Sequence, residues 1–153
     1  MCAEKFGKLD EFILGNADAA YSKVFLEHAL HPHNARSMDG ANGFAALQSQ
    51  DFSTMEIWLS VKDGVVDDIS FWTDGCGTTI ACGSMATEMV KGKTIADALS
   101  LTPGELDSAL GGLPGEGCTC AELAVGTLKQ AVRDYLAYKN EPWRRKYSGP
   151  ASR

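Results

Sequence analysis

The sequence predicts an α+β fold, a small three-stranded antiparallel sheet packed by helices. Apolar residues alternate with period two in the middle of the chain and follow a helical period on both sides of it. With 153 residues, of which 44% are hydrophobic and 22% charged, the chain is long enough to bury a core of its own. We expect an N-terminal extension over residues 1–17, one domain over 18–140 and a flexible C-terminal tail over 141–153.

The strands are predicted from alternation and from turn residues. From Met55 to Val61 the residues Met, Ile, Leu and Val alternate with Glu, Trp and Ser, which is typical of a half-buried strand. Lys-Asp-Gly at 62–64 is a hairpin turn leading to a second strand over 65–73. The segment GFAALQSQ at 43–50 adds a third strand to an antiparallel sheet.

Helical spacing and capping residues predict five helices. The one that opens at Thr102-Pro103-Gly104-Glu105 carries a capping box with proline at its first position. The others are expected at about 19–29, between Asp74 and the breaker KGK at 91–93, at 94–99, and at 121–138 after the loop GGLPGEGCTC.

Charge and cysteine content narrow the class of protein. The net charge of −6 gives no general attraction to nucleic acid or to anionic membranes. Acidic residues interrupt the start of the chain where a signal peptide would be apolar, and no stretch reaches membrane-spanning length, so we expect a cytoplasmic protein. In a reducing compartment the five cysteines are expected to be core residues, metal ligands or reactive thiols, with no disulfide framework.

Two cysteines fall where a helix is predicted to begin. Cys76 lies between two glycines after the second hairpin strand, and Cys120 closes the Cys-Thr-Cys loop before the last helix. The positive end of a helix dipole and its unpaired amides favour a thiolate. Two thiolates from separate segments suit zinc, an iron-sulfur unit or a persulfide, although spacing alone leaves a metal site and unrelated thiols equally open.

Longer motifs carry a resemblance to a known family. These are AYSKVFLEHALHPHNARSMD at 20–39, FWTDGCGTTIACGSMATEMVKGKTIADA at 71–98 and LPGEGCTCAELAVGTLKQAVRDY at 113–135, with GCG at 75–77 and TEMVKGK at 87–93 the most specific. The chain resembles the NifU/IscU-type scaffolds of iron-sulfur cluster assembly. The resemblance implies a small α+β protein that is a carrier and not an enzyme. It would accept sulfur from a cysteine desulfurase, hold a transient [2Fe-2S] cluster and pass it to apo-proteins.

The same resemblance assigns site residues. The family builds its site from three cysteines and an aspartate; Cys76 matches the second cysteine and Cys120 the third, the expected persulfide acceptor. The first cysteine should lie in a Cys-Gly-Asp turn just before Met55, where this chain reads QDFST, so Asp51 falls on or within about two residues of that ligand position. A carboxylate can bind iron or zinc but holds a soft cluster less well.

Other thiols compete to complete the coordination. Cys118 lies two residues before Cys120 and is favoured as an additional ligand. Cys82 lies six residues from Cys76, roughly 240° around a helix, and is expected to be a buried apolar residue in preference to a ligand. Thr119 replaces the family's usual histidine, and LPGEG at 113–117 replaces its Leu-Pro-Pro-Val-Lys chaperone signature, so release by a chaperone is not expected.

Two other functions remain open at this point. In one, Cys76, Cys118, Cys120 and Asp51 hold Zn²⁺ in a sulfur-relay protein that never stores a cluster. In the other, the chain is a degenerate relative that serves as a binding module. The recipients, the donor desulfurase and the formation of a homodimer are not determined by the sequence.

Some residues resemble functional groups but have simpler explanations. His28, His31 and His33 resemble a metal cluster, yet they stand at a helix end before a proline turn, and we expect solvated loop histidines. Lys91 and Lys93 match basic residues of the family, but basic residues after a helix are also ordinary partners of its dipole.

Overall fold

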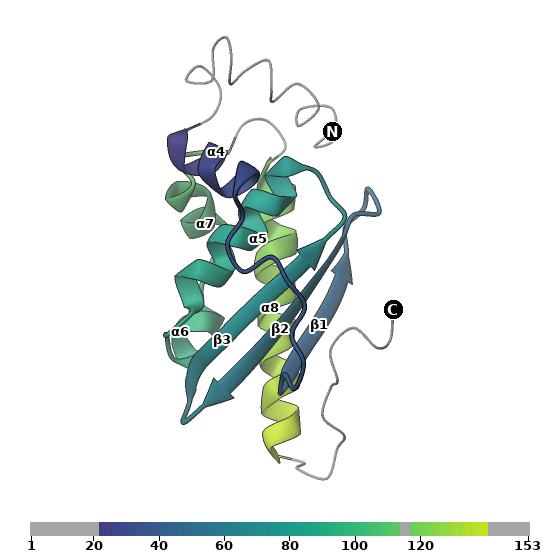
Figure 1. Ribbon diagram of the computed structural model, residues 1–153, viewed down its shortest axis with the longest axis vertical. Helices are drawn as coiled ribbons and strands as arrows, with labels where there is room; N and C mark the ends of the chain where they lie inside the picture. Colours follow the sequence, from purple (N-terminus) through teal and green to yellow (C-terminus); the bar gives the residue numbers. More distant parts are fainter. Residues whose placement is uncertain (1–21, 114–116, 141–153) are drawn as a thin grey trace.

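The computed structural model describes residues 22–113 and 117–140, with the side chains of residues 117, 118 and 140 outside this description. The described chain confirms the predicted α+β class, with three strands in one sheet and helices before and after it (Figure 1). In chain order the elements are α4 (Lys23–Leu30), β1 (Gly43–Gln48), β2 (Thr54–Lys62), β3 (Val65–Thr73), α5 (Gly77–Val90), α6 (Ile95–Ser100), α7 (Pro103–Ala109) and α8 (Gly117–Asn140).

The sheet is an antiparallel meander in the order β1-β2-β3. Gly64, in the turn between β2 and β3, has a φ of +76°, a left-handed conformation that favours glycine. A register shift between Ser60 and Val61 marks a bulge in this hairpin. The outer edge of β3 is partly covered, because Ala35 forms a parallel bridge with Phe71.

The helices cover one face of the sheet, with the long α8 lying across it (Figure 1). Alternate residues of the central strand β2 point into this layer and form the main core with residues of α5 and α8. The fully buried members from the sheet include Met55, Ile57, Leu59, Val66 and Ile69. The predicted apolar face of β2 is therefore confirmed.

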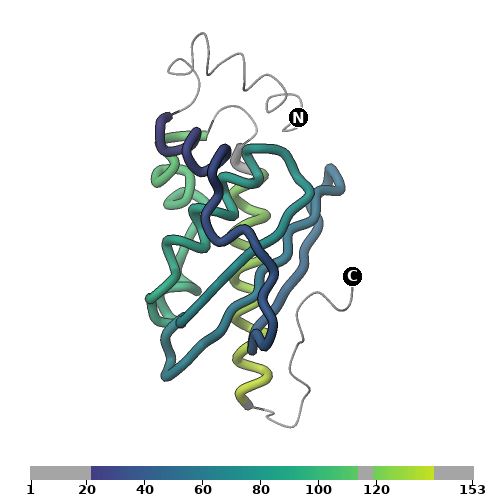
Figure 2. Tube along the Cα trace, in the orientation of Figure 1, coloured from purple at the N-terminus to yellow at the C-terminus, as the bar shows by residue number. Residues whose placement is uncertain are grey.

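The other face of β2 was predicted to be exposed, and this expectation was wrong. The segment 31–42 crosses that face (Figure 2), and it packs Met38 and Ala41 on Trp58. Trp58 is fully buried, and Glu56 is buried as well. The alternation of apolar and polar residues within β2 gives no information on whether another segment covers its second face. The segment 31–42 meets that face only in the tertiary structure.

Helix α5 is the centre of the helical layer. It contacts α4, α7, α8 and β3, and it is buried on nearly every side and not only along the predicted stripe. One cause is a close crossing with the sheet: a Cβ added to Gly83 would lie 2.6 Å from the ring of Phe71. Glycine lets the helix backbone approach the aromatic ring directly.

The start of α7 agrees with the capping residues in its sequence, whereas the start of α8 differs from the predicted one. The capping box of α7 is confirmed, since the Glu105 N–H donates to Thr102 Oγ1 and the Thr102 N–H donates to Glu105 Oε1. Helix α8 begins at Gly117, four residues before the predicted start, so Cys120 lies within its first turn and not in a loop. Cys120 and Ala121 are buried in the core shared with α5, and this tertiary packing stabilises the extra turn.

None of the described helices is long and apolar enough to cross a membrane.

Candidate thiol site

The first turns of α5 and α8 carry the two thiols of interest. Cys76 is the N-cap of α5, where its extended backbone (φ −76°, ψ −179°) precedes the first helical turn, and its carbonyl accepts the Ile80 N–H at 2.9 Å. Cys120 lies in the first turn of α8. Both side chains are buried, at 7% and 4% exposure, and neither forms a disulfide.

Thr79 links the two sulfur atoms. Its hydroxyl donates to Cys120 Sγ at 3.3 Å, and its oxygen lies 3.7 Å from Cys76 Sγ. Since the Thr79 proton points to Cys120, the Cys76 thiol is the donor in the second contact, and the Cys120 sulfur accepts from Thr79. This arrangement favours negative charge on Cys120, because a sulfur that accepts a hydrogen bond is stabilised as a thiolate.

Thr79 was not predicted as a site residue. A signal for it was present, because Thr79 follows Cys76 by three residues, and residues three apart share one face of a helix. Its link to Cys120, 41 residues further along, depends on how α5 packs on α8.

The segment that delivers Cys76 is fixed to the start of β2. Thr73 Oγ1 donates to the Thr54 carbonyl at 2.6 Å, and the Thr54 N–H donates to Asp74 Oδ1 at 2.8 Å. Gly75 allows this turn to pack on the helix, because a Cβ there would lie 2.8 Å from Thr79 atoms. These contacts hold Cys76 next to the strand that follows the Asp51 loop.

Asp51 lies in the exposed loop between β1 and β2. Ser49 Oγ donates to its carboxylate, and the Ser53 N–H donates to the same oxygen at 3.3 Å. The hydrogen bond from Ser49, assisted by those from Ser53, outweighs desolvation and lowers the pKa of Asp51 below its ordinary value of 3.8. Asp51 is therefore an ionised carboxylate at neutral pH.

Asp51 does not close on the two thiols in this conformation. Among the described residues, no group of three ligand atoms within 4.8 Å of one another includes Asp51 with Cys76 and Cys120. A cavity of about 370 Å³ separates the Asp51 loop from the start of α8. Its lining residues are Leu47, Gln48, Ser49, Gln50, Thr119, Glu122 and Leu123.

The other two predicted thiols differ in what the structure describes. Cys82 is fully buried in the core, as expected for an apolar residue. Cys118 lies in the helical backbone of α8, and its side chain is outside the described part of the chain. Cys2 lies outside the described residues altogether.

Comparisons with known proteins show the family of this chain. Residues 20–142 match the model of the NifU-like N-terminal domain. The chain belongs to the NifU-like family. The resemblance seen in its motifs is thereby confirmed.

Relatives of this NifU-like domain share both its sequence and its fold. It is 40% identical over 117 residues to a protein of Archaeoglobus fulgidus named iron-sulfur cluster assembly scaffold protein IscU 1, covering 76% of each chain. An Aquifex aeolicus protein named iron-sulfur cluster assembly scaffold protein IscU is 40% identical over 119 residues, again 76% of each. A NifU-like N-terminal protein from Brucella abortus shares the fold, with a TM-score of 0.60 at 21% identity over 79% of this chain and 97% of that one.

The histidines of this NifU-like domain differ from the expectation. His31 is exposed as predicted and His33 is half-exposed in the segment after α4, but His28 lies within α4 at 4% exposure and is therefore not a solvated loop residue. They converge with Glu88 of α5, which is 55 residues from His33 in sequence. The sequence carries no signal for such a distant partner.

The two lysines after α5 have structural partners. Lys91 Nζ lies 3.5 Å from Asp68 Oδ1 on β3. Lys93 accepts the Val66 N–H through its carbonyl at 2.8 Å. Lys93 also lines a cavity of about 280 Å³ beside α6, at the end of α5 remote from Cys76.

Proposed function

We propose that this NifU-like domain is a scaffold for iron-sulfur cluster assembly. It builds a transient [2Fe-2S] cluster as cargo on the Cys76 and Cys120 thiolates and transfers it to apo-proteins. The supporting observation is the pair of buried thiols joined through Thr79 at the first turns of two packed helices. Thiolates are the usual ligands of such clusters, and the relatives at 40% identity are named as scaffolds.

Cys120 is the proposed sulfur acceptor. Its thiolate attacks the outer sulfur of a persulfide on a cysteine desulfurase; the donor's S–S bond breaks, the donor cysteine leaves as a thiolate, and a new S–S bond forms on Cys120. The hydrogen bond from Thr79 supports this choice, since it ends on Cys120 and not on Cys76. Reduction of the persulfide sulfur to sulfide takes two further electrons from an external donor. The thiols need a reducing compartment such as the cytoplasm.

Asp51 is the proposed third ligand, in the place of the family's first cysteine. Phe52 has a φ of +67°, a left-handed conformation that favours glycine. In a Cys-Gly-Asp turn that conformation belongs to the middle glycine, so Asp51 aligns with the cysteine and Ser53 with the aspartate. Because Asp51 lies on an exposed loop across a cavity from α8, the loop would close when the metal binds. Cys118 is the competing ligand.

The scaffold proposal is tested by anaerobic reconstitution with iron, cysteine and a desulfurase. We expect wild type to gain iron and acid-labile sulfide in near-equal amounts and visible charge-transfer absorption. Both should be lost in Cys76→Ala and Cys120→Ala. Cys82→Ala is the matched control, because it removes a buried thiol of α5 outside the site. Equal cluster content in Cys120→Ala and wild type would contradict the assignment.

Asp51→Cys tests the third ligand directly. A thiolate binds iron in a cluster more strongly than a carboxylate does, so the variant should hold its cluster longer against a chelator than wild type. Asp51→Ala should hold it for a shorter time. Chelator-challenge half-lives that are the same in all three proteins would exclude Asp51 and leave Cys118 as the ligand to test.

A zinc-binding sulfur-relay protein is the second proposed function. An ionised Asp51 with two thiols is a ligand set that Zn²⁺ also accepts, with Cys118 as the fourth ligand. This function predicts zinc in the purified protein, a lower melting temperature after chelation and no colour after reconstitution with iron and sulfide. Iron and sulfide in near-equal amounts would reject it.

A further inference from the structure

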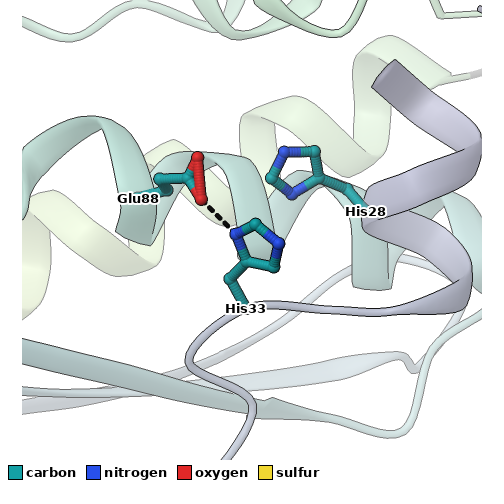
Figure 3. Close-up of side chains that lie close together, drawn as sticks. All are labelled: His28, His33 and Glu88. Carbon is teal, nitrogen blue, oxygen red and sulfur yellow. Dashed lines mark hydrogen bonds and ion pairs between the residues drawn. The ribbon is translucent and has the colours of Figure 1, made fainter. Parts of the chain in front are cut away.

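Three potential metal ligands from separate segments meet at the side of α5 away from the thiols. His28 comes from α4, His33 from the segment that follows it, and Glu88 from α5 (Figure 3). One ligand atom of each lies within 4.8 Å of the other two. The centroids of the two imidazole rings are 4.7 Å apart. Ligand atoms that converge on one point are a prerequisite for a metal site.

Ser84 orients the two histidines. Its hydroxyl lies 2.6 Å from His28 Nδ1 and accepts the His33 backbone N–H at 2.8 Å. Ser84 is fully buried. When its oxygen also accepts Nδ1–H of His28, the lone pair of His28 Nε2 is available to a metal. Metal-binding histidines are commonly held in this way, with the second ring nitrogen donating to a fixed oxygen.

Carboxylates surround the exposed side of the cluster. Glu88 Oε1 is hydrogen-bonded to His33 Nδ1, and Glu27 Oε2 lies 3.8 Å from His33 Nε2.

We propose that His28, His33 and Glu88 bind one divalent transition-metal ion of the Zn²⁺ or Fe²⁺ type. Two imidazoles and one carboxylate are a ligand set that both ions accept, and they leave coordination positions for water or another ligand. The ion takes the place of the hydrogen bond between His33 Nδ1 and Glu88 Oε1. This site goes beyond the proposed scaffold function and does not depend on it.

The site is separate from the thiols. Cys76 precedes Glu88 by 12 residues along α5, which at 1.5 Å per residue places them about 18 Å apart. Metal at the histidines joins α4 and the segment after it to α5. The same segment continues to β3, where the Phe71 N–H donates to the Asn34 carbonyl at 2.9 Å. The ion would thus fasten the chain that covers the second face of the sheet.

The test must exclude binding by the thiols. Zn²⁺ and, anaerobically, Fe²⁺ are titrated separately into the full-length Cys76→Ser/Cys118→Ser/Cys120→Ser protein, and the histidine ring nitrogens are followed by long-range ¹H–¹⁵N NMR. If Zn²⁺ binds, we expect the signals of His28 and His33 to shift while that of exposed His31 does not respond. If paramagnetic Fe²⁺ binds, the signals of His28 and His33 should shift or broaden more strongly than that of His31. The ion that produces the shift identifies the metal. No shift or broadening of the His28 and His33 signals with either ion up to about 1 mM would overturn the proposal.

Variants at the two half-exposed ligands, His33 and Glu88, test the site without removing the buried His28. Glu88→Gln and His33→Asn should each weaken metal binding at least about tenfold, and His31→Ala should leave it unchanged. With metal at about 100 times its Kd, the melting temperature of the Cys76→Ser/Cys118→Ser/Cys120→Ser protein should rise by about 5–11 °C. If Glu88→Gln binds metal as tightly as its parent, the contact between His33 and Glu88 is only an ion pair that holds the segment, and the site is refuted.

Discussion

Replacing Thr79 by valine removes the hydroxyl that links the two thiols and keeps the volume of the side chain. Thr79 is 1% exposed and its hydroxyl donates to Cys120 Sγ at 3.3 Å. Without this donor, negative charge on Cys120 loses its buried hydrogen bond. We therefore expect Thr79→Val to reduce the fraction of Cys120 present as thiolate and to slow its reactions as a nucleophile.

The size of the effect follows from the hydrogen bond. A hydrogen bond to a charged group contributes about 1.5–3 kcal/mol, which corresponds to a roughly 10- to 150-fold change in thiolate population where the thiol form dominates. A more basic thiolate is also the stronger nucleophile, with a Brønsted coefficient of about 0.4–0.5, which offsets part of the loss. The net rate of alkylation of Cys120 should fall about 4- to 20-fold.

The assay is iodoacetamide alkylation at fixed pH, resolved by peptide mass spectrometry. Thr79→Ser is the matched control, because it keeps the hydroxyl and should alkylate at close to the wild-type rate. Cys82 is fully buried in α5, the helix that carries Thr79, so increased alkylation of Cys82 would report any loosening of the fold. Equal rates at Cys120 in wild type and Thr79→Val, or a serine variant as slow as the valine one, would refute the reasoning.

Two further predictions concern the stability of the fold. Gly83→Ala and Gly126→Ala gain the same helix propensity of up to about 1 kcal/mol, but a Cβ at Gly83 lies 2.6 Å from the Phe71 ring and one at Gly126 meets its nearest atom at 3.6 Å. Gly83→Ala should be less stable than Gly126→Ala by about 1–3 kcal/mol in urea unfolding, and equal stabilities would show that the ring moves without cost. Burial raises the pKa of Asp68, but hydrogen bonds and charge, chiefly from Arg36, outweigh it and lower the pKa below 3.8. Its stabilisation is present at neutral pH and lost as pH falls through the folded-state pKa, so Arg36→Ala should cost about 0.2–1 kcal/mol at pH 7 and progressively less at acid pH as Asp68 is protonated. A cost that stays unchanged at acid pH would contradict this linkage.

The elements predicted well are those whose signals are local. The strand predicted over 65–73 agrees with β3, because alternation and a hairpin turn act within a few residues of each other. The capping box at Thr102 and Glu105 is likewise a contact between neighbours in sequence. The start of α8 was placed four residues late, because its first turn is stabilised by burial of Cys120 against α5 and not by a local cap.

The residues of the candidate site also divide into those that the sequence indicated and those that it did not. Cys76 and Cys120 were recognisable as thiols near helix starts, and their motifs carried the resemblance to a family that the comparisons confirm. Thr79 was missed, although its spacing from Cys76 was visible. Whether Asp51 or Cys118 completes the coordination remains a prediction, since the first lies across a cavity from α8 and the side chain of the second is not described.

By itself, the sequence determined the fold class, the order of the elements and the family, because strand alternation, helix caps and contiguous motifs are properties of neighbouring residues. Only the tertiary structure decided which distant groups meet. The hydroxyl of Thr79 reaches Cys120 because α5 packs on α8, and His28 and His33 reach Glu88 because the segment after α4 lies on α5. Such contacts depend on the packing of whole elements through their buried surfaces, and no spacing along the chain encodes them.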